Sequence, residues 1–118
     1  EKKPYIHMAG QETFKFAVTA ICRDCKEILE RNGLTFDDIA YIVPHQANQR
    51  IIDFASTKLK VPKEKFYLNI HKYGNTSSAS IPIALDELNR AGKLHRGDLL
   101  LLPAFGGGLA SACCLVRW

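Results

Sequence analysis

The sequence lacks an apolar run of the roughly 18 to 20 residues that a membrane-spanning helix needs. Its first ten residues, EKKPYIHMAG, also lack the continuous apolar segment of a signal peptide. These two absences argue against an integral membrane protein and against an exported protein. We therefore expect a cytoplasmic protein that does not act at a membrane.

Cysteine is scarce, with four residues in a chain of 118. Because the chain is 47% hydrophobic and has no export signal, we expect reduced thiols in the core and no disulfide framework. Cys22 and Cys25 have the first half of a zinc-binding spacing. The other two cysteines, Cys113 and Cys114, are neighbours on a predicted strand and so point to opposite faces. Four ligands cannot converge from this arrangement, and we predict no metal site.

Several other site signatures are missing. The stretch FGGGLAS matches neither the G-x-G-x-x-G fingerprint nor a P-loop, so a nucleotide phosphate site is weakly supported. No G-x-S-x-G nucleophile elbow is present. The chain has no helix-turn-helix, RNP or zinc-finger signature, and Phe54 is the single aromatic residue between positions 50 and 65. We therefore expect no nucleic-acid partner.

The charge that is present is mildly basic and locally concentrated. Sixteen Lys and Arg residues exceed twelve Asp and Glu residues, which gives a net charge of +4. Five of the basic residues fall within sixteen positions: Arg50, Lys58, Lys60, Lys63 and Lys65. This cluster fits an ordinary solvated helix face and a docking surface for an acidic partner about equally well.

Hydrophobic periodicity predicts one α/β domain, since 118 residues suffice for a single core. Helical spacing predicts helices from about Gln11 to Gly33, from about Asn48 to Val61, and from about Ser77 to Gly92, with Pro82 in the first turns of the last helix. Short apolar runs predict strands at YIHM (5–8), IAYIV (39–43), KFYLNI (65–70), DLLLLPAF (98–105) and LASACCLV (109–116). Thr35 and Asp38 form a capping pair before the second strand. We expect helices layered on a mixed sheet that ends in an antiparallel hairpin of two buried strands.

Three polar or glycine-rich segments follow directly after predicted strands: IVPHQANQR, YLNIHKYGNTSSAS and LLPAFGGGLAS. Sites in open α/β sheets gather outside the carboxyl ends of the strands, so His45, Asn75 and the 106–108 loop are expected to converge. Each segment also has a purely structural interpretation. His45 fits a helix cap or a partner for a backbone carbonyl, Asn75 fits a helix N-cap or a turn, and the glycines fit a tight hairpin.

The motifs VPHQANQRI, YGNTSSAS and AFGGGLAS, in that order and at these separations, resemble the C-terminal half of β-ketoacyl-acyl carrier protein synthase III. The similarity runs from FKFAV to the terminal LVRW. It implies a thiolase-like half-fold for residues 1–118 and a role in starting fatty acid biosynthesis. The reaction of this family is a decarboxylative Claisen condensation of an acyl-CoA with malonyl-acyl carrier protein, and the resemblance implies no cofactor besides these substrates.

The resemblance also implies roles for individual residues. His45 and Asn75 would donate hydrogen bonds to the enolate oxygen, with the imidazole kept neutral by burial. The Gly107 N–H would form half of the oxyanion hole for acyl transfer, and Phe105 would shape the pocket. Further positions match the pantetheine tunnel, namely Gln46, Ala47 and Asn48. Others match the docking surface for acidic carrier protein, namely Arg50, Lys15 and Lys58.

The family's nucleophilic cysteine belongs to the N-terminal half, which this chain lacks. None of the four cysteines lies in the small-residue setting at a helix N-terminus that a reactive thiolate requires. The resemblance therefore implies two partners, the N-terminal half and a second copy in a full-length homodimer, and an isolated chain that is incomplete and exposes apolar surface. Two alternatives stay open: a carrier-protein or CoA-binding module, and half of a polyketide-type or hydroxymethylglutaryl-CoA-type condensing enzyme. The primer acyl group is not specified.

Overall fold

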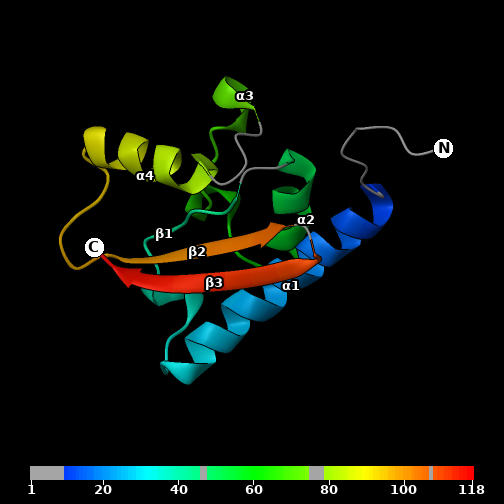
Figure 1. Cartoon of the computed structure of the whole chain (residues 1–118). Coiled ribbons are helices and arrows are strands. Elements are labelled where there is room, and N and C mark those ends of the chain that lie inside the picture. Colours follow the sequence, from blue (N-terminus) through cyan, green and yellow to red (C-terminus); the bar gives the residue numbers. More distant parts are fainter. Residues whose placement is uncertain (1–9, 46–47, 75–78, 107) are drawn as a thin grey trace.

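The computed structural model of the chain describes residues 10–45, 48–74, 79–106 and 108–118. Four α-helices, two short 3-10 helices and three strands occur in these residues (Figure 1). In chain order they are α1 (Gly10–Arg31), η1 (Phe36–Asp38), β1 (Tyr41–Ile42), α2 (Gln49–Leu59), η2 (Lys63–Lys65), α3 (Ile70–Tyr73), α4 (Ser80–Arg90), β2 (Leu99–Gly106) and β3 (Ala110–Arg117). The predicted strand at 5–8 lies outside the described residues.

The three strands form one mixed sheet in the order β1-β2-β3. β1 pairs with β2 in parallel, with Tyr41 opposite Leu100, and β2 pairs with β3 in antiparallel orientation along its whole length. Helices lie on both faces of this sheet (Figure 1). The predicted α/β class, the mixed sheet and the terminal hairpin are thus confirmed.

The two faces of the sheet carry two separate hydrophobic clusters. On one face α1 packs against α2 and against β2 and β3, and the buried cluster there includes Ile21 of α1, Ile52 of α2 and Leu101 of β2. On the other face α4 covers a smaller cluster of described residues that includes Leu88 and Leu100. Successive residues of a strand point to opposite faces, so Leu100 and Leu101 supply one side chain to each cluster.

The predicted helix ends are confirmed where glycine closes a helix. α1 ends before Gly33, whose φ of 64° lies in the left-handed region, and Leu34 N–H then bonds to the Leu29 carbonyl. α4 ends in the same way before Gly92. The predicted capping pair is present at η1, where the Thr35 backbone N–H donates to the Asp38 carboxylate at 2.9 Å.

The strand predicted at KFYLNI is wrong. Phe66 forms a single parallel bridge with Ile42, and Tyr67 N–H donates to the Ile42 carbonyl, but the chain then turns into α3 at Ile70. Asn69 is buried and its amide bonds to Glu87 of α4, which draws the backbone away from the sheet edge. A part-buried side-chain hydrogen bond of a buried asparagine here outweighs the local strand propensity.

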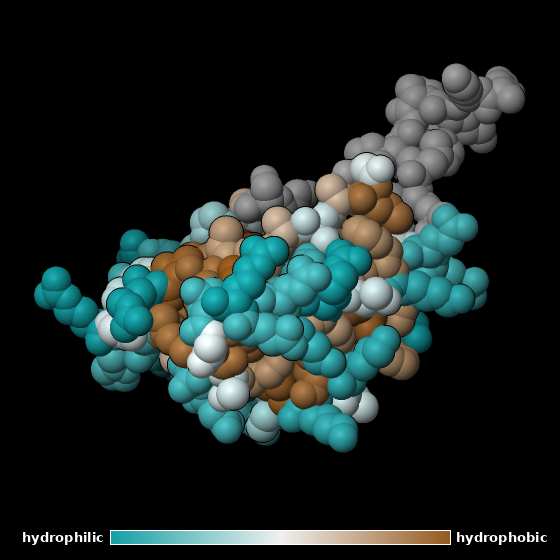
Figure 2. Space-filling model, turned by 90° about the horizontal axis from the view of Figure 1, so that it is seen from below, coloured by the Kyte–Doolittle hydropathy of each residue, from teal (hydrophilic) through white to brown (hydrophobic). Residues whose placement is uncertain are grey.

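Two further strand predictions need correction in detail. The strand expected at IAYIV is regular only at Tyr41–Ile42, although backbone N–H groups of Ala40 and Val43 also donate to β2 carbonyls. The last strand was expected to be buried, yet β3 alternates between half-buried and exposed residues. Figure 2 views the molecule from below relative to Figure 1. On this face hydrophobic patches lie beside a hydrophilic band of surface residues.

Candidate functional site

His45 lies where the chain leaves β1 beside the carboxyl end of β2. Its backbone N–H donates to the Pro103 carbonyl at 2.9 Å, which continues the parallel pairing beyond the two residues of β1. Pro44, immediately before it, is fully buried. The sheet thus fixes the backbone of His45 from one side, and its side chain starts from a rigid position.

The side chain of His45 joins elements that are far apart in the sequence. Its Nδ1 lies 2.9 Å from the hydroxyl oxygen of Ser80, the first residue of α4. The edge of its ring meets the Phe105 ring near the end of β2, with ring centroids 5.2 Å apart and planes at 82°. The imidazole is half-buried. The structure thus brings His45 and Phe105 together at the strand ends, while the predicted convergence of His45 with Asn75 and the 106–108 loop stays a prediction, since Asn75 and Gly107 lie outside the described residues.

The chain before Asn75 is tied to α4 by one carboxylate. Glu87 accepts hydrogen bonds from the Tyr67 hydroxyl at 2.9 Å and from the Asn69 amide at 3.1 Å. The Lys72 ammonium lies 3.4 Å from its other oxygen. This network holds Tyr67, Asn69 and Lys72 against the helix that also carries Ser80.

Four of the predicted site residues lie outside the described residues: Asn75, Gly107, Gln46 and Ala47. Asn48, the third predicted tunnel residue, is exposed and forms the N-cap of α2, its side-chain oxygen accepting from the Arg50 N–H at 2.8 Å. Its side chain therefore has a capping role, while its tunnel role stays a prediction. His45 does not cap α2, contrary to one structural interpretation of that residue.

The predicted basic surface is exposed on two helices that pack against each other. Arg50 and Lys58 lie on α2 and Lys15 lies on α1. The Arg50 guanidinium lies 5.5 Å from the centre of the Phe14 ring, which in turn meets the ring of Phe54. A cation above an aromatic face is held in place without losing its charge. The three positive side chains are thus available to an acidic partner.

None of the cysteines is bonded covalently to another, and two of them interact across the core. Cys25 on α1 lies 4.0 Å from Cys113 on β3, whereas Cys114 points to the opposite face and is exposed. The hydrogen bond to Cys113 and burial raise the pKa of Cys25, and burial raises the pKa of Cys22. These two thiols are poor nucleophiles because they stay protonated.

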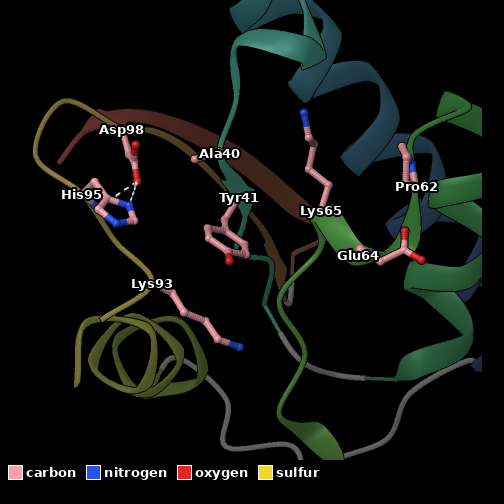
Figure 3. Close-up of a pocket in the computed structure, with 8 residues that line it drawn as sticks. All are labelled: Ala40, Tyr41, Pro62, Glu64, Lys65, Lys93, His95 and Asp98. Atoms are coloured by element: carbon pink, nitrogen blue, oxygen red, sulfur yellow. Dashed lines mark hydrogen bonds and ion pairs between the residues drawn. The ribbon is translucent and has the colours of Figure 1, made fainter. Parts of the chain in front are cut away.

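A pocket of about 460 Å³ lies at the opposite end of the strands (Figure 3). Ala40, which precedes β1, and Tyr41, which begins it, line the pocket together with Asp98, which precedes β2. The Nδ1 of His95 lies 3.7 Å from the Asp98 carboxylate there. The pocket mixes positive and negative side chains and lies at the amino ends of the parallel strands, away from His45. The described residues contain no cluster that could hold a metal ion.

Ser80 is the site residue that the sequence analysis missed. It lies in the YGNTSSAS motif, but that motif holds three serines, and the contact with His45 spans 35 positions. No local pattern indicates which hydroxyl faces the histidine. The available signal was that Ser80 falls in the first turn of the helix predicted from about Ser77.

Comparison with known proteins shows one consistent similarity. Residues 29–118 match the family described as 3-oxoacyl-[acyl-carrier-protein (ACP)] synthase III C terminal. A protein of Clostridium novyi named β-ketoacyl-[acyl-carrier-protein] synthase III is 53% identical over 113 residues. That alignment covers 96% of this chain and 35% of the relative.

Solved structures agree with this similarity. The crystal structure of 3-oxoacyl-[acyl-carrier-protein] synthase III from Aquifex aeolicus is 51% identical, with a TM-score of 0.93 over 97% of this chain. The synthase III structure from Thermus thermophilus is 47% identical, with a TM-score of 0.95 over the whole chain. In each case the match covers 37% of the solved chain. The chain thus spans about a third of the length of these relatives. Within the described residues, no helix is long and apolar enough to cross a membrane.

Proposed function

Because the chain belongs to the family of 3-oxoacyl-[acyl-carrier-protein] synthase III C-terminal domains, we propose that it is the C-terminal catalytic part of such an acyltransferase. The complete enzyme would condense an acyl-CoA with malonyl-acyl carrier protein at the start of fatty acid biosynthesis. The observation that carries the proposal is the meeting of His45 with Phe105 and Ser80 at the carboxyl ends of β1 and β2.

In the proposed reaction, an N-terminal half supplies a cysteine that first accepts the acyl group from CoA as a thioester. The malonyl thioester then loses CO2, and the electron pair of the broken bond forms an enolate on the thioester oxygen. His45 and Asn75 each donate one hydrogen bond to that oxygen, which stabilises the developing negative charge. The enolate carbon attacks the acyl thioester, and the cysteine leaves as a thiolate.

The other predicted residues would serve acyl transfer and substrate binding. The Gly107 N–H would bind the tetrahedral oxyanion of acyl transfer, and Phe105 would exclude water beside the imidazole. Gln46, Ala47 and Asn48 would line the tunnel for pantetheine. We propose a cytoplasmic homodimer in which each copy of this domain pairs with an N-terminal half. In this scheme the reaction uses its two substrates and no cofactor.

The test of the site combines this chain with the N-terminal part of the Aquifex aeolicus relative, co-expressed as a separate chain. Decarboxylation of malonyl-acyl carrier protein is then measured. We expect His45→Ala and Asn75→Ala each to reduce the rate by roughly 100-fold or more, since each removes one preorganised donor. Matched controls are His95→Ala, at the other end of the strands, and Asn89→Ala, exposed on α4. If the two site variants decarboxylate as fast as these controls, the assignment is wrong.

The carrier protein is proposed to dock on the α1–α2 surface formed by Arg50, Lys15 and Lys58. Reversing one charge should slow association with an acidic partner, and salt should screen the remaining attraction. We expect Arg50→Glu to weaken binding of acyl carrier protein about tenfold or more at low salt, measured by surface plasmon resonance. Arg31→Glu, on the last turn of α1, is the control. Equal, salt-independent binding by both variants would place the docking surface elsewhere.

A further inference from the structure

The hydrogen bond between His45 and Ser80 carries an inference that deepens the proposed function. Ser80 is 1% exposed, and its hydroxyl lies 2.9 Å from Nδ1 of His45. A buried hydroxyl oriented on one ring nitrogen is a specific contact, because the two nitrogens of a neutral imidazole have different roles. One carries the proton and donates, and the other accepts.

The position of Ser80 in α4 favours Nδ1 as the nitrogen that accepts. Ser80 begins a helix of 11 residues, and the N-terminus of a helix carries a positive potential equivalent to about half an elementary charge. This potential opposes an added proton on the nitrogen that faces it, and it favours the neutral imidazole with its lone pair directed there. Nδ1 is that nitrogen, since it contacts the first residue of α4.

We propose that the Ser80 hydroxyl donates to Nδ1 of His45 and holds the imidazole neutral, with its proton on Nε2. Ser80 is a positioning residue in this assignment, because it acts on the substrate only through His45. Nε2–H lies on the opposite side of the ring from Ser80 and becomes the donor to the enolate oxygen. The edge contact with Phe105 fixes the plane of the ring, so the direction of the Nε2–H bond is set by two elements, β2 and α4.

The catalytic role of His45 in this inference rests on the proposed function. The contact between Ser80 and Nδ1 of His45 does not depend on it. A first experiment therefore uses no substrate. Two-dimensional 15N–1H NMR of the labelled chain reports which nitrogen of each of its four histidines is protonated, with His45→Gln identifying the signals of His45. We expect an unprotonated, hydrogen-bonded Nδ1 and a protonated Nε2. A protonated Nδ1 in the wild-type chain overturns the proposal, whatever the behaviour of any variant.

A matched pair of variants separates positioning from stability. Ser80→Ala removes the hydroxyl that bonds to His45. Ser56→Ala, on α2, removes another buried hydroxyl, which donates to the Val61 carbonyl at 2.8 Å. We expect the His45 nitrogen signals to shift in Ser80→Ala, as the fixed Nε2–H form gives way to a mixture of tautomers, and to stay unchanged in Ser56→Ala. Unchanged signals in both variants contradict the proposal.

A second experiment measures decarboxylation of malonyl-acyl carrier protein by the chain assembled with its N-terminal partner. We expect Ser80→Ala to lower kcat roughly 10- to 100-fold, the usual cost of losing a group that orients a functional histidine, with KM changed less than about twofold. If Ser80→Ala and Ser56→Ala lower kcat equally, Ser80 has only a structural role. If the assembled wild-type protein has no activity, the proposed function fails, while the NMR result still decides the role of Ser80.

Discussion

Burial controls the acid–base behaviour of single residues in this chain, and Cys22 shows it most simply. The thiol lies on α1 and is 6% exposed. Burial raises its pKa above the ordinary 9.0, and the nearby Lys58 and Lys26 offset part of that shift. A raised pKa means that the folded chain keeps a proton that the unfolded chain loses. The stabilisation linked to this thiol is therefore complete below pH 9.0 and declines as the pH rises through the pKa of the folded state.

This linkage gives a prediction for the stability of the chain in alkali. Between about pH 9 and pH 10 the free energy of unfolding should fall more steeply in the wild-type chain than in Cys22→Ala, by up to about 1.4 kcal/mol per pH unit. Urea unfolding at a series of pH values measures both slopes. Cys114→Ala removes an exposed thiol and should keep the wild-type slope. Parallel curves for the wild type and Cys22→Ala would show that burial does not hold the proton.

At the scale of residues, the sequence singled out His45 but not the residues that contact it. His45 follows an apolar run, and strand ends meet at one edge of a sheet, whereas Phe105 was indicated only by the family resemblance. The partner of His45 could not be found, because the choice of Ser80 depends on the rotation of α4 about its axis. That rotation is set by the packing of Leu88 and Ala84 against Leu100, which is a tertiary property.

The ends of α2 illustrate how single elements are stabilised. Its N-terminus is capped by the side chain of Asn48, but its C-terminus is closed by Lys60 at a φ of 58°. A side chain in the left-handed region crowds the following carbonyl, at a cost of roughly 1 kcal/mol or more. Glycine avoids that cost. The helix therefore ends on a residue that fits its conformation poorly.

We predict that glycine has opposite effects on stability at two lysines, one at the C-cap of α2 and one inside the helix. Lys60→Gly should raise the free energy of unfolding by about 0.5–1 kcal/mol, since it relieves the left-handed strain. Lys58→Gly, two positions earlier and inside the helix, should lower it by about 1 kcal/mol. Thermal unfolding by circular dichroism compares the two exposed substitutions directly. A loss of stability in both would mean that the flexibility of glycine in the unfolded chain outweighs the strain at Lys60.

At the scale of elements, hydrophobic periodicity was sufficient for the long helices and the hairpin. It failed at residues 65–70, where a sequence with strand propensity forms one bridge and then a helical turn. Tyr67 and Asn69 both bond to Glu87, a residue some 20 positions later. Local propensity cannot report such a partner. The part-buried hydrogen bonds to Glu87 therefore favour the turn into α3, and the sequence alone could not show them.

At the scale of the whole molecule, the helices cover the two faces of β3 unequally. Ser111, Cys113 and Leu115 of β3 face α1, where they contact Arg23, Cys25 and the larger hydrophobic cluster. The alternate residues point to the face covered by α4. Among them Val116 packs against the smaller cluster, but Ala110, Ala112 and Cys114 are exposed. Among the described residues, no helix thus covers this stretch of sheet surface, which is made of small side chains.

This open stretch of β3 fits the proposal that an N-terminal half completes the fold, because small side chains let another layer approach closely. An arginine placed there should leave the isolated chain intact, since Ala112 is exposed, yet it should prevent close packing of a partner. We predict that Ala112→Arg keeps the wild-type melting temperature within about 3 °C. It should also abolish co-purification with the co-expressed N-terminal part of the Aquifex aeolicus relative. Thr19→Arg adds the same side chain to an exposed position of α1 and should co-purify normally. Retention of the partner by Ala112→Arg would mean that the N-terminal half binds another face of this domain.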